Sequence, residues 1–152
     1  MSWFQKARHA NMPTQKIEYY TRALDQDPQN ARIYHNRANA YESMRNLNRA
    51  LEEYTRALQL DSTASITYRN RAHVYQQLGH HENAIQDYNQ AVRADPLDAG
   101  SWLYRGISYL QLGNLDTALE SLSRSKQLDS DQAAVWFNLG NLYSRMKDYD
   151  KA

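Results

Sequence analysis

The chain has 152 residues, and its 18 basic and 17 acidic side chains give it a formal net charge of +1. Charges this balanced create no field that would favour nucleic acid or an anionic membrane as a partner. The sequence lacks cysteine, which excludes disulfides, thiol catalysis and thiolate metal sites, and it has no apolar run typical of a membrane span or a signal peptide. We therefore expect a soluble, cytoplasmic protein.

Residues 1–30 are predicted to form an incomplete unit of two helices. Ile17, Tyr20 and Ala23 give the second helix one apolar face, whereas the first helix has no such pattern. We expect Trp3 and the phenylalanine beside it to cover the open apolar end of the molecule.

Residues 31–64 are predicted to form a helical hairpin. Along its first helix, apolar or small residues recur at spacings of three and four: Tyr34, Ala38, Tyr41 and Met44. The second helix carries a stripe of the same kind: Leu47, Ala50, Leu51, Tyr54, Ala57 and Leu58. The two stripes face each other when the chain turns back on itself.

Residues 65–98 and 99–132 are predicted to form two further hairpins. Gly79 and Gly113 stand between the helices, where a left-handed residue ends the first helix. The second helix of the earlier hairpin ends near Asp95, because the proline that follows disfavours a helical conformation there. No segment of the sequence favours a strand.

Residues 133–152 are predicted to contain the first helix of another hairpin and only the start of its second helix. A helical stack without a polar closing helix exposes apolar surface. We therefore expect end-to-end self-association through residues near Trp136, Leu139 and Tyr143.

These units follow one another at a constant step of 34 residues. Four columns share that step: Tyr41, Tyr75, Tyr109 and Tyr143; Asp27, Asp61, Asp95 and Asp129; Ala50, Ala84, Ala118 and Ala152; and Ala23, Ala57, Ala91 and Ser125. A repeat of this length is one supersecondary unit that buries its apolar face against its neighbours. The sequence thus predicts an all-α solenoid, a class of protein that works through its exposed surface.

The repeated columns resemble the tetratricopeptide repeat. That motif has a large residue at position 4, small residues at 8, 20 and 27, aromatics at 11 and 24, glycine at 15 and proline at 32. The unit that starts at Ser65 supplies all of them: Tyr68, Ala72, Tyr75, Gly79, Ala84, Tyr88, Ala91 and Pro96. The next unit departs from the motif at Leu122, Ser125 and Ser130. The resemblance covers about residues 14–152 and implies a right-handed superhelix of antiparallel helix-turn-helix hairpins that binds other proteins.

The resemblance further implies a concave groove lined by the first helix of each hairpin. Asparagine recurs at two groove positions: Asn36, Asn70 and Asn138 at position 6, and Asn39 and Asn141 at position 9. An asparagine amide can pair with both the N–H and the C=O of an extended peptide. Asparagines one repeat apart are therefore expected to hold a peptide backbone, as in the asparagine ladder of O-linked N-acetylglucosamine transferases. The alternative is that they are simply solvated.

The side chains of the groove change in character along it. The first half is basic, with one opposing carboxylate at Glu42: Arg32, His35, Arg69 and His73. The second half is apolar: Leu103, Tyr104, Ile107 and Phe137. An acidic segment beside a large apolar anchor would complement both halves. The alternative is that Leu103 and Ile107 cover contacts between repeats.

One subfamily of these repeat proteins consists of co-chaperones that clamp the C-terminal carboxylate of heat-shock chaperones. His35, Asn39 and Asn70 match part of the clamp. Gly100 and Tyr104 stand where the clamp requires two cations. Binding of chaperone tails therefore remains an alternative with an incomplete site.

A second ladder, Arg37, Arg71 and Arg105, occupies position 7, where the family more often has leucine. We expect their aliphatic stems to cover the hairpin while the guanidinium groups reach solvent or an acidic neighbour. Their role is then structural.

Other functional classes lack their signatures in this sequence. The histidines are scattered, so neither a catalytic constellation nor a metal site is expected, and the adjacent His80 and His81 are interpreted as a solvated turn. No glycine-rich loop indicates a nucleotide cofactor. The sequence therefore predicts a non-enzymatic module without a cofactor. The main alternative to a peptide groove is a scaffold or oligomerisation module that acts through its ends or its convex face.

Overall fold

The computed structural model describes the backbone of residues 1–151 and the side chains of residues 1–148; within this part of the chain it contains nine α-helices and no strand. The helices are α1 (Trp3–His9), α2 (Pro13–Gln26), α3 (Ala31–Ser43), α4 (Leu47–Leu60), α5 (Ser65–Gln77), α6 (His81–Ala94), α7 (Ala99–Gln111), α8 (Leu115–Leu128) and α9 (Ala133–Lys151). The predicted all-α class is confirmed.

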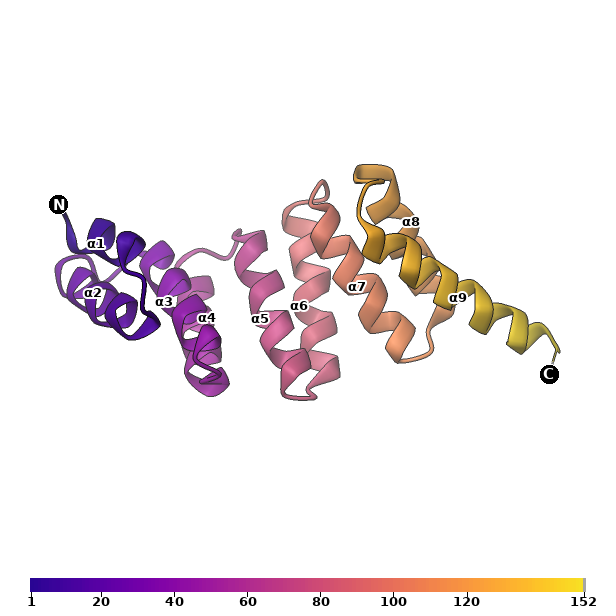
Figure 1. The fold of residues 1–152 in the computed structure, drawn as a ribbon, viewed down its shortest axis with the longest axis horizontal. Coiled ribbons are helices and arrows are strands. Elements are labelled where there is room, and N and C mark those ends of the chain that lie inside the picture. The colour runs from indigo at the N-terminus through magenta and orange to yellow at the C-terminus, as the bar shows by residue number, and fades with distance from the viewer. Residues whose placement is uncertain (152) are drawn as a thin grey trace.

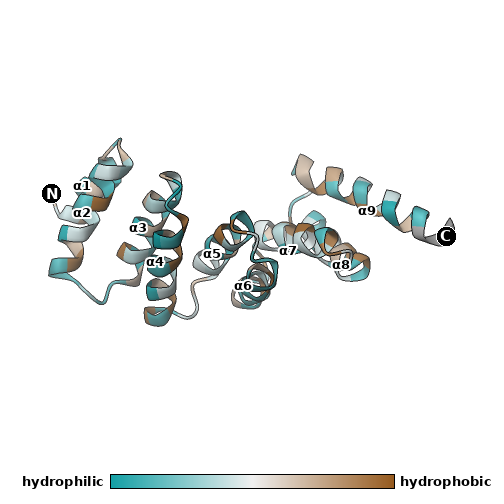
Figure 2. Cartoon of the chain, turned by 90° about the horizontal axis from the view of Figure 1, so that it is seen from below, coloured by the Kyte–Doolittle hydropathy of each residue, from teal (hydrophilic) through white to brown (hydrophobic). Residues whose placement is uncertain are grey.

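The helices form a solenoid in which each packs mainly against its neighbours in sequence. Figure 1 shows antiparallel helix pairs stacked side by side along the long axis, with the two termini at opposite ends. Seen from the side in Figure 2, the pairs follow an arc, with α3, α5 and α7 on its inner side and α4, α6 and α8 on its outer side. The first helix of each hairpin thus lines the concave face.

Turns between the helices use the residues that the sequence pattern indicated. Gly79 and Gly113 have φ of 77° and 78°, a left-handed conformation that glycine adopts without strain. Arg45 takes the same position in the first hairpin with φ of 61°. Asparagine side chains then cap the following helices, with Asn46 accepting from the start of α4 and Asn114 from the start of α8.

Small and large residues interdigitate where the two helices of a hairpin cross. Ala72, Ala84 and Tyr88 are fully buried together between α5 and α6. At the crossing of α7 and α8, a Cβ atom added to Gly106 would lie 2.8 Å from Cγ of Leu122. Close approach of the helices therefore requires the small residues of position 8.

The arginine ladder holds the stack together from inside. Arg71 on α5 donates from Nε and Nη2 to both carboxylate oxygens of Asp87 on α6, at 2.6 and 2.8 Å. Its Nη1 also donates to Oγ1 of Thr55 on α4, at 3.0 Å. One guanidinium thus joins the second helix of its own hairpin to that of the preceding hairpin, and its partner is a buried carboxylate rather than solvent.

The other two arginines repeat this arrangement with different partners. Arg37 donates to both oxygens of Glu53, each at 2.8 Å, and to Thr21. Arg105 donates to Asn89 and Ser121, at 2.8 and 2.7 Å. The structural role predicted for the ladder fits this geometry, although the ladder runs through the inter-repeat interface and not over its surface.

The two ends differ from the central hairpins. At the N-terminus, Trp3 and Phe4 pack on Tyr19 and Tyr20, with ring centroids 5.8 and 5.9 Å apart. At the C-terminus, α9 continues through Lys147 as one helix, although the repeat pattern predicts a turn there. Ala152, the last member of its predicted column, lies outside the described residues. Among the described residues, no helix is long and apolar enough to span a membrane.

Candidate functional site

The concave face contains two neighbouring depressions that bring most of the predicted groove residues together. The first, here called the central pocket, has a volume of about 360 Å³ and is lined by Glu42, Arg69, Asn70, His73 and Tyr104. The second, here called the C-terminal pocket, has a volume of about 460 Å³ and is lined by Ile107, Leu110, Gln111, Asn138, Asn141, Ser144 and Arg145. Together they extend across α3, α5, α7 and α9.

Glu42 organises the polar groups of the central pocket. Its Oε2 accepts a hydrogen bond from the hydroxyl of Tyr54 at 2.8 Å. Its Oε1 lies 3.0 Å from Nδ1 of His73 and accepts from the amide of Gln77 at 3.1 Å. The sequence identified Glu42 only as a lone opposing charge. Tyr54 stands in the apolar stripe of its helix, which indicated packing and did not predict its hydrogen bond to Glu42.

Burial and these contacts shift the pKa values of Glu42, His73 and Tyr54. Burial alone would raise the pKa of Glu42, but hydrogen bonds from His73, Tyr54 and Gln77 lower it overall. The hydrogen bond to Glu42 raises the pKa of His73 more than burial lowers it. Burial raises the pKa of Tyr54, and the carboxylate of Glu42 adds to the effect. Glu42 is therefore held as a carboxylate with His73 as its titrating partner.

The three asparagines of position 6 lie in different environments. The amide nitrogen of Asn70 donates to Oδ1 of Asn39 at 3.1 Å, and that oxygen also lies 2.5 Å from the hydroxyl of Tyr54. Asn138 donates to the carbonyl of Ala134 in its own helix at 2.8 Å. Asn36 makes no side-chain hydrogen bond to the described part of the chain. The geometry thus leaves donors and acceptors free in the groove but does not distinguish a peptide ladder from solvated amides.

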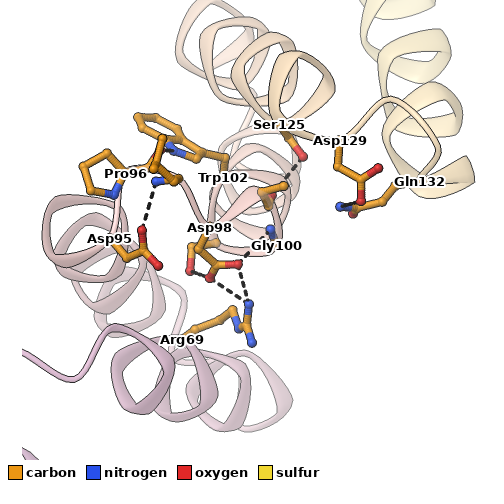
Figure 3. Close-up of polar contacts among 12 residues, drawn as sticks. Arg69, Asp95, Pro96, Asp98, Gly100, Trp102, Ser125, Asp129 and Gln132 are labelled. Atoms are coloured by element: carbon orange, nitrogen blue, oxygen red, sulfur yellow. Dashed lines mark hydrogen bonds and ion pairs between the residues drawn. The ribbon is translucent and has the colours of Figure 1, made fainter.

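The basic half of the groove is less positive than its residue types suggest. Arg69 donates through Nη1 to both oxygens of Asp98, at 2.8 and 2.7 Å, and Figure 3 shows the pair bridging α5 and the start of α7. Gly100 makes room for this contact, because a Cβ there would lie 2.7 Å from the same nitrogen. His35 contacts Oγ1 of Thr67 at 2.8 Å, and burial lowers its pKa. Of the four predicted cations, Arg69 is thus neutralised by a carboxylate and His35 is favoured in its neutral form.

Arg32, the first predicted cation, lies apart from both pockets. It is exposed near the N-terminal end of the groove, and its guanidinium stacks over the ring of Phe4 at 4.6 Å. It lines a separate depression of about 440 Å³ beside Asn30 and Ile33. The structure therefore does not bring Arg32 together with Arg69 and His73.

The apolar half of the groove is divided between surface and core. Leu103 is only 5% exposed and packs with Leu122 and Leu139 in the C-terminal core. The prediction that it lines an apolar pocket is therefore corrected: Leu103 covers contacts between hairpins. Tyr104 and Phe137 are 40% and 69% exposed and remain available on the surface.

Tyr104 is the aromatic group best placed for a ligand. Its ring stacks on that of Tyr88, with centroids 6.2 Å apart and planes inclined by 14°, and the residue is 40% exposed. His73 lies beside it at 6.2 Å between ring centroids. The central pocket thus offers hydrogen bonding, one ion pair and an aromatic face. Within the described part of the chain, no group of three His, Asp or Glu side chains is placed to hold a metal ion.

The shape and sequence of the chain agree with known repeat proteins. Models of the tetratricopeptide repeat match residues 31–63, 69–133 and 133–152. No curated protein matches the sequence.

Among solved structures, a MamA protein superposes with a TM-score of 0.87 at 18% identity, over 98% of this chain and 83% of that one. MamA from Desulfovibrio magneticus RS-1 gives a TM-score of 0.85 at 17% identity, over 97% and 83%. The first repeat domain of Spaghetti (RPAP3), bound to an HSP90 peptide, gives 0.76 at 22% identity, over 78% and 94%. Identities this low establish the fold alone. With the repeat models and the hairpin geometry, they show that the chain belongs to the tetratricopeptide repeat family.

Proposed function

We propose that this chain is a protein–protein interaction module that binds an extended peptide segment in its concave groove. The observation that carries the proposal is the juxtaposition of the central and C-terminal pockets on the inner helices. Polar amides line both pockets, and the half-exposed Tyr104 lines the central one. Ligand sites commonly combine such a concave surface with a few convergent polar groups.

In this proposal the amides act on the peptide backbone and the aromatics on a side chain. Asn36, Asn70 and Asn138 pair with backbone N–H and C=O groups, independently of the peptide sequence. An apolar side chain of the peptide packs against Tyr104 or Phe137. Asn70 exchanges its bond to Asn39 for one to the peptide, so binding costs one internal hydrogen bond and gains at least one external bond.

The charge of the groove sets a preference in the partner. His73 is the cation best placed to meet an acidic residue, because Arg69 is already paired with Asp98. Glu42 lies directly behind His73 and disfavours a second negative charge nearby. We therefore propose a segment with one acidic residue next to an apolar anchor, and not a strongly acidic tail.

A displayed library of random peptides tests the groove directly. Peptides selected on the native chain are re-tested on an Asn70→Ala/Tyr104→Ala variant of the central pocket. The matched control is Gln86→Ala/Gln90→Ala, which alters two exposed amides on the outer helix α6. We expect the pocket variant to lose at least tenfold in affinity and the control to retain it, with circular dichroism unchanged in both. Equal loss in both variants, or in neither, would contradict a groove site.

A second candidate is the binding of chaperone tails. The observation in its favour is the Asn39–Asn70 pair, together with the likeness in fold to a domain whose structure contains the HSP90 peptide SRMEEVD. Gly100 and Tyr104 supply no cation, and His35 is held neutral by burial. We expect this peptide to bind at least tenfold more weakly than library-selected peptides in calorimetric titrations. If the HSP90 peptide bound as tightly as the selected peptides, binding of chaperone tails would be favoured instead.

The scaffold alternative predicts a different outcome in the library test. A module that acts through its convex face or its ends would keep its partners when the groove is altered.

A further inference from the structure

One hydroxyl in the tyrosine column of the repeats has no partner. In two repeats the tyrosine of this column donates to the first helix of its hairpin: Tyr54 to Oε2 of Glu42 and Tyr88 to Oε1 of Gln76, each at 2.8 Å. The hydroxyl of Tyr20, one repeat earlier, makes no hydrogen bond to the described part of the chain, although the residue is only 4% exposed. Because no fully buried polar side-chain atom of the described residues lacks a partner, this hydroxyl must open to the surface.

An arginine stands where the other repeats place the acceptor. Arg8 lies 34 residues before Glu42 and therefore occupies the same repeat position. A guanidinium has donors and no acceptor, so it cannot accept the hydrogen bond of Tyr20. The hydroxyl and the guanidinium are thus both available as donors to a third group.

A second arginine approaches the same tyrosine from α3. The guanidinium of Arg32 stacks over the ring of Phe4 at 4.6 Å, and Phe4 packs on Tyr20 with ring centroids 5.9 Å apart. Arg8 follows Phe4 by one helical turn, on the same face of α1. Arginines from two different helices are thereby placed beside one tyrosine.

The positive charge around Tyr20 is not neutralised by an ion pair. Burial raises the pKa of Tyr20, and the charges of Arg8 and Arg32 lower it in part, so both guanidinium groups lie close enough to act on the hydroxyl. The net shift is upward, which keeps the hydroxyl protonated and able to donate at neutral pH. Within the described chain, neither arginine pairs with a carboxylate, in contrast to Arg37 and Arg71.

One carboxylate lies at the edge of this cluster. Asp27 lines the depression of about 440 Å³ that Arg32 also borders, and its Oδ2 accepts from the amide of Asn30 at 2.8 Å. Asp27 does not shift the pKa of Tyr20, whereas both arginines do. The surroundings of the hydroxyl therefore remain positive.

We infer that Arg8, Tyr20 and Arg32 form a binding site for the phosphoryl group of a phosphorylated side chain on a partner peptide. Such a group carries a charge of about −1.5 to −2 and three strong acceptor oxygens, which match two guanidinium groups and one hydroxyl. A carboxylate, with one charge and two oxygens, matches them less completely. Clusters of arginine are a recurring means of recognising phosphorylated segments.

This inference rests on the proposed function only in that a peptide carries the phosphoryl group. The site shares no residue with the central or the C-terminal pocket. A peptide bound in the groove would reach it at the N-terminal end. Phosphorylation of the partner at that point would then strengthen its binding to this chain.

Capped tripeptides with phosphoserine, aspartate or serine between two glycines test the site without the groove. In NMR titrations of the full chain at constant ionic strength, we expect the phosphoserine tripeptide to shift the side-chain Nε–H signals of Arg8 and Arg32. It should bind several-fold more tightly than the aspartate tripeptide, and the serine tripeptide should not bind. Equal binding of the aspartate and phosphoserine tripeptides would overturn the assignment to a phosphoryl group.

Three variants and one matched control locate the binding. Arg8→Gln and Arg32→Gln should each weaken binding of the phosphoserine tripeptide about tenfold, because each removes a charge-assisted hydrogen bond. Tyr20→Phe removes only the hydroxyl and should weaken it several-fold. The control Arg93→Gln alters another exposed arginine without an ion pair in the described chain, on α6, and should have no effect. Absence of binding, or binding indifferent to the three variants, would overturn the site.

An array of synthetic peptides with one phosphoserine separates this inference from the proposed function. If both hold, phosphorylated peptides lose affinity in Arg8→Gln/Arg32→Gln and also in Asn70→Ala/Tyr104→Ala. If unphosphorylated peptides bind the central pocket and phosphoserine adds nothing, the phosphoryl site alone is overturned. If phosphoserine binds through the two arginines and Asn70→Ala/Tyr104→Ala changes nothing, the groove alone is overturned and the phosphoryl site stands.

Discussion

At the scale of single residues, Arg71 and Asp87 form an ion pair that is nearly closed to solvent, with side chains 16% and 7% exposed. Removing the arginine leaves a buried carboxylate without its partner, which typically costs about 3–5 kcal/mol. We expect Arg71→Met to lower the free energy of unfolding by that amount in urea titrations. Arg71→Met/Asp87→Leu, which removes both charges, should recover most of the loss.

Arg105 provides the matched control for this prediction. Its polar partners are Asn89 and Ser121, and its carboxylate contact, Glu120, is 64% exposed at 3.5 Å. Arg105→Met therefore strands no buried charge, and we expect it to cost less than half as much as Arg71→Met. Equal losses would show that packing of the arginine stems, and not the buried ion pair, stabilises the ladder.

The contact between His73 and Glu42 predicts a pH dependence with a defined sign. Because the pKa of His73 is raised above 6.5 on folding, its contribution is fully present below about pH 6.5 and is lost as the pH rises through the folded value. The pKa of Glu42 is lowered below 4.5, so its contribution is present above about pH 4.5 and is lost as the pH falls through the folded value. The pair should therefore stabilise the fold most between these limits.

Two measurements check this window. The difference in unfolding free energy between the native chain and His73→Ala should shrink as the pH is raised from about 6 to about 8. In imidazole NMR titrations, His73 should titrate above 6.5, whereas His35, whose pKa is lowered by burial, should titrate below it. The reverse order of the two histidines would contradict the assigned contacts.

At the scale of the helices, two glycines at the same repeat position are predicted to respond in opposite ways. A Cβ at Gly106 would lie 2.8 and 2.9 Å from Cγ and Cδ2 of Leu122 and 3.2 Å from its backbone nitrogen. Gly106→Ala should therefore destabilise the fold by about 1–3 kcal/mol through overpacking.

Gly140 has open space instead, so Gly140→Ala should stabilise the fold by up to about 1 kcal/mol through helix propensity. Thermal unfolding of both variants, beside that of the native chain, gives the comparison. A stabilising Gly106→Ala would mean that α7 and α8 separate more easily than their contacts indicate.

Most features of the helices could be predicted from the sequence, because they depend on local residue types. Gly79 and Gly113 indicated the turns, and the alanine and tyrosine columns indicated the close crossings. The course of α9 through Lys147 was not predicted. The repeat pattern places a turn there, but the chain has no glycine at that position to end the helix.

At the scale of the whole molecule, the 34-residue step predicted the solenoid but could not predict how its groove is charged. Arg69 counted as a free cation until the structure placed Asp98, 29 residues further on, within 2.7 Å of it. Leu103 counted as a groove residue, although adjacent helices bury it. Such contacts depend on how neighbouring hairpins are rotated, which a periodicity does not specify.

Amide NMR shifts of the native chain, titrated with the tightest library-selected peptide, show whether the concave face binds a peptide. We expect the largest shifts in α3, α5 and α7, around Asn70, His73 and Tyr104, and further shifts in the residues of α9 that line the C-terminal pocket. Shifts confined to the outer helices α4, α6 and α8 would contradict binding in the groove.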